Sequence, residues 1–178
     1  IVQVRCRSNA APAAHHLKSE ASMEAPLLNE KSVTLAGAAR AVGRPKDTLR
    51  GWLDKGGAQF LFSGEGKGWR RFFGADIAIM AIALPMLEFG LRPEFAFKLA
   101  REAVMAKAEL KGATWAELRH AAAFYATERL LVRHDADRWR AQWVSDRQTV
   151  SGVGGPALVL NPCGLVLAAL WRLEDKAA

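Results

Sequence analysis

The sequence predicts a mainly α-helical protein with a small β component. From Val33 onward, apolar residues recur in several segments at the three- and four-residue spacing of helices. Shorter aromatic and β-branched runs, bounded by glycine, proline or aspartate, are typical of a few strands. The 178 residues, of which 51% are apolar, have the composition of a globular protein with one domain or two small ones.

Residues 1–32 lack this periodicity and are rich in alanine, serine, asparagine and proline, which predicts a disordered tail. The chain begins at Ile1 rather than at a methionine, and Met23 is a candidate start. Residues 1–22 would then be foreign to the natural protein, so our prediction of the fold begins at Val33.

Two short helices joined by a tight turn follow the tail. Thr34 can cap the first helix, over residues 35–42, and Gly43 ends it because glycine adopts the left-handed conformation at little cost. Pro45 suits the first turn of the second helix, which runs to about Lys55. Its inward face is Leu49, Trp52 and Leu53. This pair is a candidate helix-turn-helix.

An aromatic hairpin is predicted next. The runs Phe60–Phe62 and Trp69–Phe73 flank a glycine-rich loop, a pattern typical of two strands and their turn. A hairpin placed after a helix-turn-helix is a wing. A helix over residues 75–89 and another from Pro93 to before Gly112 complete a winged helix-turn-helix domain over residues 33–111. The apolar face predicted for the last helix is Phe95, Leu99 and Val104.

Residues 113–178 predict a small α+β module. Thr114 and Glu117 can form a capping box for one helix, and Asn161 can cap a last helix that opens at Pro162 and ends near Leu173. Strands are expected at 129–134, 138–145 and 157–160. The module carries four tryptophans, which we expect in its core, on a self-association surface or around a small-ligand pocket. They are Trp115, Trp139, Trp143 and Trp171.

The positive charge of the chain is concentrated in the first predicted domain. The formal net charge is +7, and residues 31–111 hold +6 of it, against +1 for residues 112–178. Residues 40–71 alone hold +5. A polyanion is therefore the expected partner of the helix-turn-helix and hairpin, whereas a solvated basic face is the simpler alternative. The nearly neutral last third is expected to face a protein or a ligand.

Two motifs stand out in this basic block, Thr48-Leu49-Arg50-Gly51-Trp52 and Gly68-Trp69-Arg70-Arg71-Phe72. The first resembles the recognition helix, and the second the wing, of the winged-helix DNA-binding domain of the MerR family of bacterial regulators. An apolar helix from Asp76 to Gly90 follows, as in the family. The resemblance covers about residues 34–100 and implies base or phosphate contacts from Thr48, Arg50 and Arg70.

Trp52 stands where the family has tyrosine, and core packing is the alternative to a DNA contact there. From charge and resemblance together, the expected DNA-contacting residues are Arg44, Lys46, Thr48, Arg50, Trp52, Lys67, Trp69, Arg70 and Arg71. The family's long dimerisation helix has no counterpart after Lys111, so we expect a homodimer formed through residues 113–178 instead.

The expected function is that of a sequence-specific, double-stranded DNA-binding transcriptional regulator, cytoplasmic and nucleoid-associated, with no enzymatic activity and no cofactor. Residues 113–178 could also bind a small-molecule or protein effector. Cys6 and Cys163 lie too far apart in the sequence for a metal motif, and no apolar stretch is long enough to cross a membrane. The alternatives are a phage-type or architectural factor, such as an excisionase or small terminase subunit, and a protein-interaction module.

Overall fold

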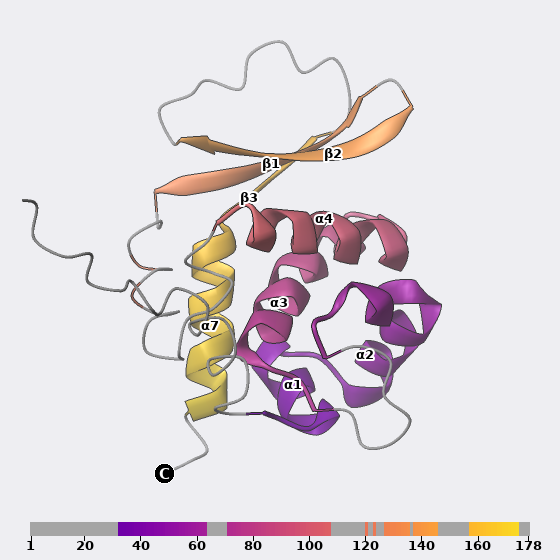
Figure 1. The fold of residues 1–178 in the computed structure, drawn as a ribbon, viewed down its shortest axis with the longest axis vertical. Helices are drawn as coiled ribbons and strands as arrows, with labels where there is room; N and C mark the ends of the chain where they lie inside the picture. The colour runs from indigo at the N-terminus through magenta and orange to yellow at the C-terminus, as the bar shows by residue number, and fades with distance from the viewer. Residues whose placement is uncertain are drawn as a thin grey trace, which may run out of the picture.

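The computed structural model describes residues 32–63, 71–107, 120, 123, 127–135, 137–145 and 157–174. It is mainly helical, with one small antiparallel sheet that forms a layer over helix α4 (Figure 1). The helices are α1 (Leu35–Val42), α2 (Lys46–Trp52), α3 (Gly74–Glu88), α4 (Pro93–Met105) and α7 (Pro162–Glu174), and the strands are β1 (Glu128–Asp135), β2 (Arg138–Ser145) and β3 (Ala157–Leu160). The mainly α prediction with a small β component is thus confirmed.

Local signals set the ends of α1 as predicted. The Thr34 hydroxyl accepts a hydrogen bond from the Gly37 N–H at 3.3 Å, and Gly43 ends the helix with φ at 68°. The Arg44 N–H then donates to the Ala39 carbonyl at 2.9 Å, which satisfies a carbonyl of the last turn. The chain therefore turns sharply into α2.

After Trp52 the chain reaches a kink at Lys55 and Gly56, whose backbone angles are not helical, and a short 3-10 helix over Ala58–Phe60 follows. Gly56 adopts φ of 99°, which glycine alone reaches without strain. At Gly57 a Cβ would lie 2.9 Å from both the Phe97 ring and the Trp52 carbonyl. Gly56 and Gly57 therefore allow this turn to approach α4 closely.

The predicted first strand of the hairpin, Phe60–Phe62, is wrong. Phe60 ends the 3-10 helix, and the Phe62 N–H donates to the Asp76 carboxylate at 2.6 Å instead of to a strand. Phe72 pairs with Val33, in an isolated antiparallel bridge. The aromatic composition of residues 60–62 favours a strand. In the structure, however, the buried carboxylate of Asp76 accepts the Phe62 N–H, which is therefore not available to a strand partner.

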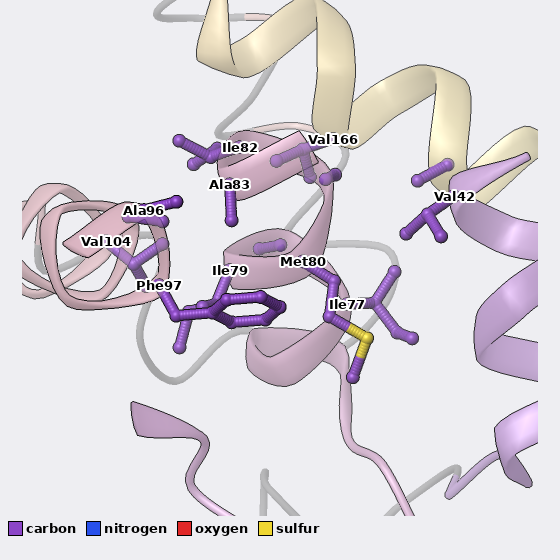
Figure 2. Close-up of a cluster of buried hydrophobic side chains, with 14 of the residues drawn as sticks. Val42, Ile77, Ile79, Met80, Ile82, Ala83, Ala96, Phe97, Val104 and Val166 are labelled. Atoms are coloured by element: carbon purple, nitrogen blue, oxygen red, sulfur yellow. The ribbon is translucent and has the colours of Figure 1, made fainter. Parts of the chain in front are cut away.

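Helix α3 is the centre of the core. Its residues are apolar on all sides, and those from Ala75 to Ala83 are buried. Figure 2 shows Phe97 and Val104 of α4 on one side of α3, with Val42 of α1 and Val166 of α7 on others. A helix that is hydrophobic all round must be enclosed by neighbours, which explains this central position.

Helix α4 buries a different face from the predicted one. Leu99 and Val104 are buried as predicted, but Phe95 is 43% exposed. The buried positions also include Ala96, Phe97, Ala100 and Ala103. The small alanines bring α4 close to α3 and the glycine turn, and Phe95 is left just outside this arc.

The sheet has the strand order β2-β1-β3, with both pairings antiparallel. The prediction of these strands is confirmed to within one residue at each end. Leu130 and Val132 of β1 are fully buried and belong to the same core as α3. Alternation along β2 places Trp139 and Trp143 on this inner face.

Helix α7 opens as predicted, because the Asn161 side chain accepts a hydrogen bond from the Gly164 N–H at 3.0 Å. It packs against both α1 and α3, and the Arg172 guanidinium donates to the Ala41 carbonyl at 3.2 Å. One hydrophobic core therefore includes residues from both predicted segments, 33–111 and 113–178. Residues 1–31 of the predicted tail and nearly all of the predicted helix at Thr114 lie outside the described residues.

Candidate nucleic-acid interface

Helix α2 presents a polar face to solvent from a fixed position. Leu49 is 1% exposed and Leu53, which follows the helix, is 3% exposed, so the opposite side is held in the core. The exposed residues of α2 are Lys46, Asp47, Thr48 and Arg50. Three of the predicted contact residues are therefore exposed on α2, and two of them, Lys46 and Arg50, lie four residues apart on the same side of the helix.

Arg50 and Asp47 form an exposed ion pair across one turn of α2. An Arg50 terminal nitrogen lies 3.4 Å from the Asp47 carboxylate, and the Asp47 side chain is 90% exposed. An exposed pair of this kind is weak, so the guanidinium can exchange this partner for another acceptor. The pair keeps Arg50 on the exposed face without burying its charge.

Arg44 has a partner that the sequence did not suggest. It lies in the turn between α1 and α2 and forms an ion pair with Glu88 at the end of α3. Both side chains are partly exposed. The pair ties the turn to the central helix, so Arg44 positions α2 as well as adding positive charge beside it.

Trp52 packs partly buried against the hydrophobic core, as its alternative interpretation predicts. Arg71 is exposed, and its guanidinium donates at 3.5 Å to the carbonyl of Ser32, which precedes α1. The bridge between Val33 and Phe72 fixes it there. Lys67, Trp69 and Arg70 lie outside the described residues, as does Trp115.

Asp76 binds both ends of the segment from Phe62 to Phe73, which contains Lys67, Trp69 and Arg70. Its two carboxylate oxygens accept the Phe62 N–H at 2.6 Å and the Phe73 N–H at 3.0 Å. Asp76 is fully buried, and burial raises its pKa above the usual 3.8, partly offset by these two hydrogen bonds. Residues 62 and 73 are thereby fixed to the first turn of α3.

The tryptophans of the last third join the sheet to α4. The Trp143 indole N–H donates to the Ala103 carbonyl at 3.2 Å, which satisfies a carbonyl of the last helical turn. Trp139 packs edge-to-face on Phe89, with ring centroids 6.3 Å apart. Trp171 is 60% exposed. Trp139 and Trp143 therefore contact the helical layer.

A second group of arginines lies on the outer face of the sheet. Arg133 of β1 is directly opposite Arg140 of β2, and Arg138 is next to it on the same face. A carboxylate oxygen of Asp135 lies 3.4 Å from Nε of Arg140. Like charges directly opposite are unfavourable, so this face suits an anion. This group of arginines could have been found in the sequence, because Arg138 and Arg140 alternate along a predicted strand.

Among the described residues, no group of three histidine, cysteine or acidic side chains could hold a metal ion. No helix in the same part of the chain is long and apolar enough to cross a membrane. Comparison of the sequence with known protein-family models and with curated proteins gives no match.

Proposed function

We propose that the protein is a sequence-specific, double-stranded DNA-binding regulator of transcription, with α2 as its recognition helix. The observation that carries this proposal is the exposed surface of α2, where Lys46 and Arg50 share one side of the helix, Thr48 is exposed on another side, and Leu49 is buried in the core. The major groove admits a helix and distinguishes all four base pairs by their edges. Arginine is the side chain that most often recognises guanine there.

The MerR-like motifs support the same proposal. Thr48 and Arg50 are the recognition-helix residues of that resemblance, and both are exposed. The segment between Phe62 and Phe73 would act as the wing, because Asp76 fixes both of its ends and it carries Lys67 and Arg70. Its cations would contact phosphates, which position a protein on DNA without specifying sequence.

In this proposal the protein acts as a homodimer in the cytoplasm, associated with the nucleoid. Two copies of α2 would contact two half-sites, which compensates for the few base pairs that one short helix covers. Residues 113–178 would mediate dimerisation or respond to a small-molecule or protein effector.

The test uses DNA fragments selected from a genome by the purified protein. Arg50→Ala should weaken binding to the selected site by about 1–3 kcal/mol and leave affinity for unrelated DNA much less affected. Arg133→Ala is the matched control, since it removes an arginine from the sheet, at the other end of the molecule in Figure 1. It should leave specific binding unchanged.

Equal affinity of wild type and Arg50→Ala for the selected site would contradict the role of α2. Binding to phosphates must also weaken as salt concentration rises. No affinity for any DNA at low salt would instead support the protein-interaction module.

The arginines on the outer face of the sheet favour a second candidate function, an architectural factor that holds two DNA segments. Arg133 and Arg140 belong to β1 and β2, and these strands lie at the other end of the molecule from α2 (Figure 1). Such a factor would join two labelled DNA duplexes in a pull-down assay, and Arg133→Ala would reduce this joining without reducing binding to one duplex. A promoter regulator with one interface would not join them.

A further inference from the structure

Strand β2 forms one long edge of the sheet among the described residues. The strand order β2-β1-β3 places it at an edge over all eight of its residues, and none of the described strands pairs with its other side. Every second residue of an edge strand directs its N–H and C=O groups outward. Long edges without proline or a bulge are usual sites for pairing with another chain.

Helix α4 exposes a mixed stripe beside this edge. The stripe consists of Phe95, Lys98, Glu102 and Met105, and both of its apolar members are at least 40% exposed. A groove of about 490 Å³ separates the stripe from β2, and Lys98, Glu102 and Ala141 all line it. The helix stripe and the strand edge therefore form one surface.

The stripe is complementary to itself. Lys98 and Glu102 stand two residues on either side of Ala100, and Phe95 and Met105 stand five residues on either side. When two copies of α4 lie antiparallel with Ala100 at the centre, each Lys98 faces Glu102 of the second copy. Each Phe95 then faces Met105 of the second copy. Opposite charges and apolar groups are matched along the whole stripe.

Strand β2 has the same property about Ala141. Antiparallel pairing of two β2 strands centred on Ala141 places Trp139 opposite Trp143 of the second copy on the inner face. On the outer face, Arg140 faces Gln142 and Arg138 faces Val144, so no two arginines are directly opposite. Trp143, on one side of Ala141, donates to the Ala103 carbonyl, and Trp139, on the other side, lines the groove together with Phe95 and Lys98. Ala141 is therefore level with the middle of α4, and one two-fold axis can serve both centres.

We propose that a second copy of this chain binds the surface formed by β2 and the α4 stripe, which makes a two-fold dimer with a continuous six-stranded sheet. Such an interface is isologous, since the same patch is used by both copies. It is independent of DNA binding by α2, because none of its residues belongs to that helix.

The first test is sedimentation equilibrium of the full chain without DNA. Wild type should be a dimer at tens of micromolar. Lys98→Glu and Glu102→Lys should each weaken the dimer by about tenfold or more, because each puts two like-charged pairs across the axis. An equimolar mixture of the two variants should form heterodimers, and the double variant K98E/E102K should dimerise like wild type. Unchanged circular dichroism and melting temperature show that each variant folds.

The second test is a disulfide across the axis in a Cys6→Ser background. Ala141→Cys places two cysteines directly opposite, with Cα atoms roughly 5 Å apart, which a disulfide can span. Gln142→Cys is the matched control, because its two copies would be roughly 8 Å apart. We expect a covalent dimer under mild oxidation for Ala141→Cys alone.

Three outcomes would overturn the proposal. They are a wild-type monomer at tens of micromolar, a dimer that neither charge reversal weakens, and equal cross-linking by the two cysteine variants. If the protein does not bind DNA but its dimer responds to the charge reversals and cysteine variants as expected, the proposed function is rejected and this interface is supported.

Discussion

Gly51 and Gly57 lie six residues apart and differ in the space that surrounds them. No atom lies within 4 Å of a Cβ added to Gly51, which is the next-to-last residue of α2. A Cβ added to Gly57 would lie 2.9 Å from the Trp52 carbonyl oxygen and the Phe97 ring. Gly51 therefore has room for a side chain, whereas Gly57 is required by the packing of its turn on α4.

We expect Gly57→Ala to lower the free energy of unfolding by about 1–3 kcal/mol, because backbone and ring must move apart. Gly51→Ala should raise it by about 0.5–1 kcal/mol, since alanine favours the helix. Urea unfolding of both variants measures the difference. Equal destabilisation by the two substitutions would mean that Gly57 is not closely packed.

Cys163 should be chemically inert in the folded protein. Its side chain is fully buried at the start of α7, and burial, with a smaller effect from Glu128, raises its pKa to about 11 from a usual 9.0. The thiolate is the reactive form, so alkylation at pH 8 should be slower than for free cysteine by about a hundredfold from the pKa alone.

Iodoacetamide labelling of a Cys6→Ser variant, followed by mass spectrometry, measures this rate at Cys163 alone. Denaturant should restore the rate of free cysteine. Fast labelling without denaturant would show that the start of α7 opens readily in the native protein.

At the scale of elements, Asp76 connects α3 to the segment proposed as the wing. Asparagine at this position can accept only one of the two backbone N–H groups, and its own amide would face the other. Asp76→Asn should therefore destabilise the fold by about 1–3 kcal/mol. It should also weaken DNA binding, because residues 62 and 73 lose their common anchor.

The pH dependence of this substitution follows from the raised pKa of Asp76. The folded state holds the proton more tightly than the unfolded state, so the contribution of Asp76 is fully present below about pH 3.8 and declines as pH rises through the folded pKa. The stability gap between wild type and Asp76→Asn should accordingly be larger at pH 4.5 than at pH 8, by urea unfolding. A gap that widens with pH would require a lowered pKa.

Elements with local end signals could be predicted from the sequence. Thr34, Gly43 and Asn161 cap their helices through hydrogen bonds within a few residues, so the bounds of α1 and α7 were predicted to within a residue. The error at residues 60–62 has a long-range cause, since the acceptor of the Phe62 N–H is fourteen residues away on α3. Local composition carries no information about such a partner.

In the candidate site, too, local features were predictable from the sequence and long-range contacts were not. The exposed face of α2 follows from helical periodicity and was predicted, including Lys46, Thr48 and Arg50. The ion pair between Arg44 and Glu88 and the contact of Trp143 with Ala103 were not, because both join elements far apart in the sequence. The surface of β2 and α4 also depends on packing that periodicity alone does not reveal.

At the scale of the whole molecule, α7 decides whether the protein is one folding unit or two. Leu170 is fully buried in the core that also contains α1 and α3, whereas the neighbouring Trp171 is 60% exposed. Arg172 adds a hydrogen bond to the end of α1. The helix-turn-helix is therefore expected to depend on the last helix of the chain for its stability.

Leu170→Ala should lower the free energy of unfolding by about 2–5 kcal/mol, because it leaves a cavity beside α1 and α3. Trp171→Ala should change it little, since that side chain is largely exposed. Hydrogen exchange measured by mass spectrometry should quicken across α1 and α2 in Leu170→Ala as much as in α7, because all three open in one cooperative transition. Faster exchange confined to α7 and the sheet would instead show that residues 33–111 fold independently of α7.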